Sequence, residues 1–352
     1  MRRGLMQWDP EELPVAVLET RIAGLRAAMQ GAGLDAFILY TNLVRPSAVA
    51  YLTGFTPYWS EGLLLVPAAG RLVFATALSN RVADWIRATN PVSEVISTPR
   101  PGKLLGERLA GDAAVKRVGI LELDAMPSEL ACDLAGAAPA IAWIDGSAPF
   151  AGIRRRIDAA EGRLLTHADA LAVAALDQRA TTSDAGTLAG LVEQHARLAG
   201  AEEIYVALAP DLAADRRLNR VSKPVTLADR FAVRASLAYK GSWVRRTRTF
   251  APDGAVAEAD EWFAGVVRGI EVGTPIASWL AQNITSLPGA TLEGWMVERC
   301  VGSYPLAVTA SSRSPGDDAP TDGGFLVLAV ELRLDGAPWI GSAPVFVGTP
   351  HF

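Results

Sequence analysis

Histidine and cysteine are both scarce in this chain, and each shortage excludes a class of site. The 352 residues include three histidines, His167, His195 and His351. Histidine is the commonest metal ligand in proteins, so a centre built on several histidines is not expected. The two cysteines, Cys132 and Cys300, are too few for a disulfide framework. We therefore expect a cytoplasmic protein that is not held together by disulfides.

Long apolar runs and an excess of basic charge are also missing. No uninterrupted apolar stretch approaches the roughly 20 residues that a membrane span needs. The N-terminal residues reach Asp9-Pro10-Glu11-Glu12 without an apolar core, so no secretory signal is expected. The formal net charge is −5, which argues against nucleic-acid binding through bulk charge. Half of the residues are hydrophobic, so a large buried core is possible. The expected partners therefore include neither nucleic acid nor membrane.

The first part of the chain reads as an α/β domain. Apolar residues at helical spacing predict a helix over 15–30, and further helices are expected over 80–89 and 128–134. Short apolar runs bounded by Gly and Pro predict strands at 36–40, 62–66, 72–75, 94–97, 117–121 and 140–144. A domain boundary near Pro149–Arg156 gives an N-terminal domain over 1–152.

The second part, residues 153–352, reads as an α+β domain. Helices are expected at 159–178, 182–198, 258–270 and 276–284, with Ser183 as the N-cap of the second. Strands are expected at 204–208, 231–237, 243–250, 325–332 and 339–347. Residues 311–324 are rich in Ser, Pro, Gly and Asp, which is typical of a loop.

Several short motifs resemble those of one protein family. Tyr51-Leu52-Thr53-Gly54-Phe55 in the first part, and Tyr239-Lys240-Gly241 with Thr247-Arg248-Thr249-Phe250 in the second, resemble segments of the creatinase, aminopeptidase P and prolidase family. Val330-Glu331-Leu332 resembles the strand that carries that family's first catalytic glutamate. The resemblance implies a creatinase-like N-terminal domain followed by a pita-bread domain. It also implies a dimer, either with a second copy or with a homologue.

The metal-dependent relatives hold two divalent ions with two Asp, one His and two Glu residues, but few of these have a counterpart here. By resemblance, the two aspartate positions are occupied by Arg234 and Arg245, and the histidine position by Ser303. The first glutamate is Glu331, whereas the second falls near Gly341 or Ser342. A further histidine, which contacts substrate in relatives, aligns with Arg216.

Charge decides what such a site could hold. Arginine keeps its positive charge in proteins and offers no acceptor atom. A divalent cation about 4 Å from one guanidinium would be repelled by roughly 8 kcal/mol at an effective dielectric constant near 20. We therefore expect no metal and no other cofactor. Because guanidinium groups match carboxylates, we expect a small anionic substrate bound by Arg234, Arg245, Arg216 and Ser303, with Glu331 as the catalytic base.

Other interpretations of the same residues stay open. Arg234 and Arg245 could pair with acidic neighbours such as Glu331 or Asp229 and fill an inert cavity. An ordinary metallopeptidase whose ligands are misaligned is a further alternative. Two functions follow from the residues. One is a metal-independent enzyme that hydrolyses or eliminates at a carbon–nitrogen bond, and the other is a non-catalytic relative that binds a ligand or a partner subunit.

Overall fold

The computed structural model describes residues 8–57, 61–177, 182–221 and 223–348, and their contacts divide the chain into two compact units. The first unit contains the residues up to Arg155 together with the segment Cys300–Pro305. The second unit contains Arg156–Arg299 and the residues from Leu306 onward. The sequence places its boundary at 152/153, and His351 lies outside the described residues.

The first unit is built on a six-stranded sheet in the order β4-β3-β2-β1-β5-β6. Strand β1 pairs antiparallel with β2 and parallel with β5, so the sheet is mixed. Its strands are β1 (Ala36–Thr41), β2 (Gly62–Pro67), β3 (Leu72–Thr76), β4 (Ser93–Ser97), β5 (Arg117–Leu121) and β6 (Ala142–Asp145). All six residues of β1 are buried, as expected for a central strand with both faces covered.

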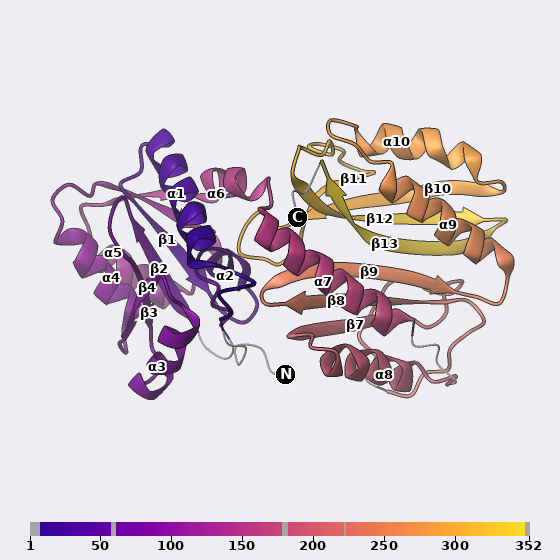
Figure 1. Cartoon of the computed structure of the whole chain (residues 1–352), viewed down its shortest axis with the longest axis horizontal. Helices are drawn as coiled ribbons and strands as arrows, with labels where there is room; N and C mark the ends of the chain where they lie inside the picture. Colours follow the sequence, from indigo (N-terminus) through magenta and orange to yellow (C-terminus); the bar gives the residue numbers. More distant parts are fainter. Residues whose placement is uncertain (1–7, 58–60, 178–181, 222, 349–352) are drawn as a thin grey trace. The chain divides into compact units, whose positions relative to one another are not determined.

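Helices cover both faces of this sheet, which gives the first unit three layers (Figure 1). One apolar cluster joins the sheet to the first, second, third and sixth helices, and another joins it to the fourth and fifth. These helices are α1 (Val15–Gly31), α2 (Ser47–Thr53), α3 (Asn80–Thr89), α4 (Pro101–Ala110), α5 (Ser128–Ala137) and α6 (Ser147–Arg154). Phe37 and Phe150 are fully buried between the layers.

The second unit is built on a seven-stranded sheet in the order β11-β10-β12-β13-β9-β8-β7. The strands are β7 (Glu203–Ala209), β8 (Phe231–Tyr239), β9 (Ser242–Phe250), β10 (Ala290–Arg299), β11 (Ala307–Ser311), β12 (Gly324–Leu334) and β13 (Ala337–Val347). All the pairs are antiparallel. Two hairpins turn through a residue at positive φ followed by Gly, at Lys240-Gly241 and Asp335-Gly336, as two-residue hairpin loops require.

Four helices pack on this sheet, and α7 and α9 lie on the same face of it (Figure 1). Their bounds are α7 (Ala159–Leu176), α8 (Ala185–Leu198), α9 (Gly254–Arg268) and α10 (Ile276–Asn283). Helices α7 and α8 bury the side chains of β7 and β8, while α9 and α10 bury those of β10, β12 and β13. No described helix is both long enough and apolar enough to cross a membrane.

The predicted fold classes are confirmed, and most of the predicted helices and strands are present within a few residues of their expected ends. The sequence pattern missed the helices α2, α4 and α6 and the strands β10 and β11. The expected N-cap of α8 was wrong, because Asp184 caps the helix and its carboxylate accepts a hydrogen bond from the Thr187 N–H. Asp and Ser compete closely as N-caps, and here the carboxylate also accepts from the Val225 N–H at 3.0 Å.

Candidate functional site

Five side chains follow one line across the second sheet, on the face opposite α7 and α8. In the order of the strands β8, β9, β13, β12 and β10, each of these residues pairs with the next. They are Arg234, Thr247, Ser342, Ala329 and Met296. Successive residues of a strand point to opposite faces, so the neighbours of Arg234 in β8 pack against the helices instead. All five line one pocket of about 460 Å³.

This cavity, called the sheet pocket here, has many charged residues in its lining. Its wall includes four arginines and three carboxylates. They are Arg216, Arg217, Arg234, Arg245, Asp215, Glu298 and Glu331. The structure thus brings together four of the residues that the sequence singles out, Arg216, Arg234, Arg245 and Glu331. They come from the loop between β7 and β8 and from three different strands, β8, β9 and β12.

Arg234 is the cation of this pocket that lacks a partner. Its half-buried guanidinium makes no hydrogen bond or ion pair with any residue that the structure describes. Burial and the neighbouring charge of Arg245 lower the pKa of Arg234, and the Glu298 carboxylate offsets part of this effect. The group stays protonated at neutral pH. A partly desolvated cation without a counter-ion gains free energy when an anion binds beside it.

Arg245, by contrast, is fully engaged. Its guanidinium forms an ion pair with Glu298, and its Nε donates to Ser236 Oγ at 2.9 Å. The Glu298 side chain is only 8% exposed, so the pair is largely removed from water. Arg245 does pair with an acidic neighbour, as one interpretation of the sequence allows, but the partner is Glu298 of β10 and neither Glu331 nor Asp229.

The other two arginines also have carboxylate partners. Arg216 pairs with Glu293, which accepts a second hydrogen bond from Arg333 at 2.7 Å. Burial alone would raise the pKa of Glu293, but these two hydrogen bonds lower it below its ordinary value. Arg217 pairs with Asp215 at 2.9 Å on the pocket rim, where its side chain is 83% exposed. Three of the four arginines therefore have a carboxylate partner within the protein, although Arg216 shares its partner with Arg333.

Glu331 is the carboxylate that remains free. It is exposed, it lines the sheet pocket, and among the described residues it has no hydrogen-bond or ion-pair partner. Ser342, near the expected position of the second glutamate, donates a hydrogen bond to Thr247 Oγ1 at 2.8 Å instead. Once the internal pairs are counted, the sheet pocket contains one unmatched cation, Arg234, and one unmatched carboxylate, Glu331.

Ser303 is not among the residues that line the sheet pocket. It belongs to the Cys300–Pro305 segment of the first unit and is 2% exposed. Its hydroxyl and its backbone N–H both donate to the Glu122 carboxylate, the latter at 3.1 Å. Arg45 pairs with the same carboxylate. Ser303 thus attaches this segment to Glu122, and its hydroxyl already donates a hydrogen bond to that carboxylate.

The residues present do not fit the two divalent ions that the resemblance implies. Arg234 and Arg245 both line the sheet pocket, and of its three carboxylates Glu298 and Asp215 are paired with arginines, which leaves Glu331 alone as a free acidic donor. Across the described ranges, no group of three or more His, Cys, Asp or Glu side chains is placed to hold a metal ion. The donor set therefore disagrees with the chemistry of metal-dependent relatives.

Sequence reasoning missed two acidic residues, Glu293 and Glu298, because it missed strand β10. A signal was available, since Trp295 and Val297 alternate with Met296 and Glu298 in the period-2 pattern of a strand. The intervening Gly294, at an irregularity in the pairing with β12, weakens that pattern.

Comparison with known proteins places the first part of the chain in a family. A model of the creatinase/prolidase N-terminal domain matches residues 21–156. These residues form a creatinase/prolidase N-terminal domain. None of the curated protein sequences matches the chain significantly.

Solved structures extend the likeness to nearly the whole chain. The X-Pro aminopeptidase from Thermotoga maritima superposes with a TM-score of 0.70 at 16% identity, covering 92% of this chain and 96% of its own. The Xaa-Pro dipeptidase from Bacillus anthracis gives 0.69 at 17% identity, with 95% of each chain covered. The N-terminal domain of the FACT complex subunit SPT16 from chickpea (Cicer arietinum) gives 0.66 at 12% identity, covering 95% of this chain and 94% of its own.

These comparisons confirm the expected architecture. The creatinase/prolidase N-terminal domain is followed by a pita-bread domain, as in X-Pro aminopeptidases and prolidases. Identities of 12–17% show a shared fold and no more. The activity must therefore be argued from this chain's own pocket residues.

Proposed function

We propose that the sheet pocket binds a small molecule bearing a carboxylate and acts on a carbon–nitrogen bond of that molecule without a metal. Arg234 binds the carboxylate, and Glu331 is the general base. The observation that carries the proposal is the unmatched Arg234 guanidinium in a 460 Å³ pocket that also contains the unmatched Glu331. The volume lies within the roughly 300–1,000 Å³ that is common for small-molecule sites.

Charge balance favours this ligand over a cation or a neutral molecule. Glu293 is shared by Arg216 and Arg333, so the arginines in and beside the pocket carry one positive charge more than the carboxylates. The charged groups counted are Arg216, Arg217, Arg234, Arg245 and Arg333 against Asp215, Glu293, Glu298 and Glu331. A single negative charge at Arg234 balances this excess. A guanidinium presents a planar fork of N–H donors that matches the two oxygens of a carboxylate. The Arg245–Glu298 ion pair forms part of the pocket wall, and its two charges neutralise each other.

Glu331 supplies the proton transfer that either reaction class needs. In hydrolysis, the Glu331 carboxylate takes a proton from water as the water oxygen bonds to carbon, the carbon–nitrogen bond breaks, and the proton passes to the leaving nitrogen. In elimination, Glu331 takes a proton from the carbon next to the one that carries nitrogen, and the proton again leaves on nitrogen. Both sequences balance without a metal or another cofactor.

The first test measures ligand binding by the intact protein. A thermal-shift panel of dicarboxylates, amino acids and phosphates should identify carboxylates that raise the melting temperature. Loss of a charge-assisted hydrogen bond costs about 1.5–3 kcal/mol, so Arg234→Ala should weaken binding roughly tenfold or more. Arg217→Ala is the matched control, since it removes the same charge from a paired rim residue and should change affinity less than about twofold. Equal losses in the two variants would refute a specific role of Arg234.

Glu331→Gln separates catalysis from binding. General-base catalysis contributes roughly 10²–10⁴-fold, so this variant should lose turnover of a bound carboxylate by about that factor. It should keep its affinity within about threefold. Binding without turnover in the wild-type protein would point to a ligand-binding relative instead. The cytoplasmic location and the dimer, with a second copy or a homologue, remain predictions.

A further inference from the structure

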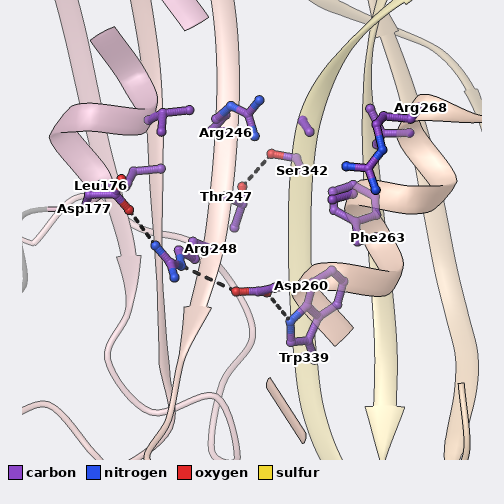
Figure 2. Close-up of a pocket in the computed structure, with 14 residues that line it drawn as sticks. Leu176, Asp177, Arg246, Thr247, Arg248, Asp260, Phe263, Arg268, Trp339 and Ser342 are labelled. Carbon is purple, nitrogen blue, oxygen red and sulfur yellow. Dashed lines mark hydrogen bonds and ion pairs between the residues drawn. The ribbon is translucent and has the colours of Figure 1, made fainter. Parts of the chain in front are cut away.

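A second cavity lies on the other face of the same sheet, between α7 and α9 (Figure 2). It has a volume of about 390 Å³ and is called the helix pocket here. Its floor is the line where β9 meets β13. Small side chains, Ala264 of α9 and Ala343 of β13, contribute to its lining, and they leave room where larger residues would have filled the space.

The two helices give the helix pocket an apolar wall. Val173 and Leu176 come from the last turns of α7, while Phe263 and Val267 come from α9. Val173 is 38% exposed, which is high for a large apolar side chain beside a core. A ligand with an apolar body would cover this surface and remove it from water, which is favourable by about 25 cal/mol per Å².

The polar groups of the floor already satisfy one another. Arg248 pairs with Asp177 at 2.7 Å and with Asp260 at 3.5 Å, and Trp339 Nε1 donates to Asp260 at 3.1 Å (Figure 2). Arg246, the other floor arginine, pairs with Asp169 through two hydrogen bonds. The floor therefore has no acidic group left to attract a cation.

Arg268 differs from the other two arginines of the helix pocket, Arg246 and Arg248, which both have carboxylate partners. It lines the helix pocket from the last turn of α9, and no described residue forms a hydrogen bond or ion pair with it. Figure 2 shows its side chain beside Phe263, extending toward the floor at Ser342. A cation in the last turn of a helix also interacts favourably with the helix dipole, but that interaction requires neither a cavity nor an apolar neighbour.

We propose that the helix pocket binds a small amphipathic carboxylate, with its apolar body between α7 and α9 and its carboxylate on Arg268. One unmatched positive charge beside an apolar wall suits a monoanion with a branched or aromatic body. Inorganic phosphate would leave the wall exposed, and a dicarboxylate would bring a second charge into apolar surroundings.

The experiment uses 3-phenylpropionate and its uncharged amide as probes, with the full-length chain and isothermal titration calorimetry. The acid should bind, and the amide should bind at least tenfold more weakly because it lacks the charge that pairs with Arg268. Arg268→Ala should reduce the affinity for the acid roughly tenfold, and Arg268→Lys should recover part of it. The control is Arg220→Ala, which removes an exposed arginine that lines neither pocket and should leave affinity unchanged.

Two further variants keep the test independent of the sheet pocket, which shares Thr247 and Ser342 with the helix pocket. Ala264→Leu fills the cavity without changing charge and should weaken binding of the acid. Arg234→Ala should remove only binding at the sheet pocket and should leave the site whose affinity depends on Arg268. The proposal is overturned if the wild-type protein does not bind the acid, if the amide binds as well, or if Arg234→Ala rather than Arg268→Ala removes binding.

Discussion

Two arginines, Arg234 and Arg245, lie side by side in the sheet pocket but have different roles. At positions where metal-dependent relatives are expected to have aspartates, this chain has Arg234 and Arg245, and both line the pocket. Their environments differ, because Arg245 has Glu298 as a counter-ion and Arg234 has no partner among the described residues. The same residue type therefore stabilises the pocket wall in one position and is available to a ligand in the other.

Tyr40 in the first unit allows a residue-scale test of pH dependence. Its ring is 4% exposed, and its hydroxyl donates to Glu61 Oε2 at 2.8 Å. Burial and this carboxylate raise the pKa of Tyr40 to about 12, against about 10 in an unfolded chain. The unfolded state thus loses the phenol proton first, so this contribution to stability is complete below about pH 10 and is lost as the pH rises toward 12.

The measurement compares urea unfolding of the wild-type protein and of Tyr40→Phe across that range. The wild-type protein should lose stability more steeply than the variant above about pH 10, because phenylalanine has no proton to lose. The variant also lacks the hydrogen bond to Glu61, which shifts its stability below pH 10 by a constant amount. A difference between the two proteins that stays the same at every pH would contradict the assignment.

At the scale of elements, the meeting of β9 and β13 holds the two halves of the second sheet together. The ladder pair described between these strands is Ser342 with Thr247. Thr249 adds to it, since its buried hydroxyl donates to the Ile340 carbonyl at 2.8 Å and accepts from the Ile340 N–H at 3.0 Å. The Thr249 side chain thus supplies two hydrogen bonds between β9 and β13 in addition to the backbone pairing at Ser342 and Thr247.

Thr249→Val should therefore destabilise the protein. The replacement keeps the shape but leaves the buried N–H and C=O of Ile340 unpaired, which costs about 2–6 kcal/mol at about 1–3 kcal/mol for each group. The readout is the urea midpoint, with the slope of the transition unchanged. Thr291→Val on β10 is the control, since Thr291 is exposed and its substitution should stay within about 0.5 kcal/mol. Similar midpoints for the two variants would exclude this role of Thr249.

At the scale of the whole molecule, chain order and compact units do not coincide. The Cys300–Pro305 segment interrupts the second unit in sequence yet belongs to the first. Glu122, held at a φ of 54°, binds this segment through Ser303, and Arg45 completes the cluster. A Cβ atom on Gly302 would lie 2.3 Å from Glu122 Oε1, so a larger residue at this position would displace that carboxylate from its contact with Ser303.

Gly302→Val should weaken this attachment and lower the stability of the first unit by about 1 kcal/mol, because the Glu122 carboxylate must move away from Ser303. Hydrogen exchange is the readout, and amides of 300–305 should exchange faster in the variant. In a Glu122→Ala background the clash is absent, so the same substitution should cost less. Strictly additive effects of the two substitutions would contradict a direct contact between Gly302 and Glu122.

The sequence by itself determined the fold class and most of the helices and strands, and it singled out Arg234 and Arg245 as candidate site residues. These follow from local periodicity and from the chemistry of the residue types, which act over a few neighbouring positions. Only the tertiary structure decided which arginine has a counter-ion. Glu298 lies 53 residues from Arg245 in the chain, and Glu293 lies 77 residues from Arg216. Such pairing depends on strand order and register, because side chains distant in sequence meet only once the sheet has formed.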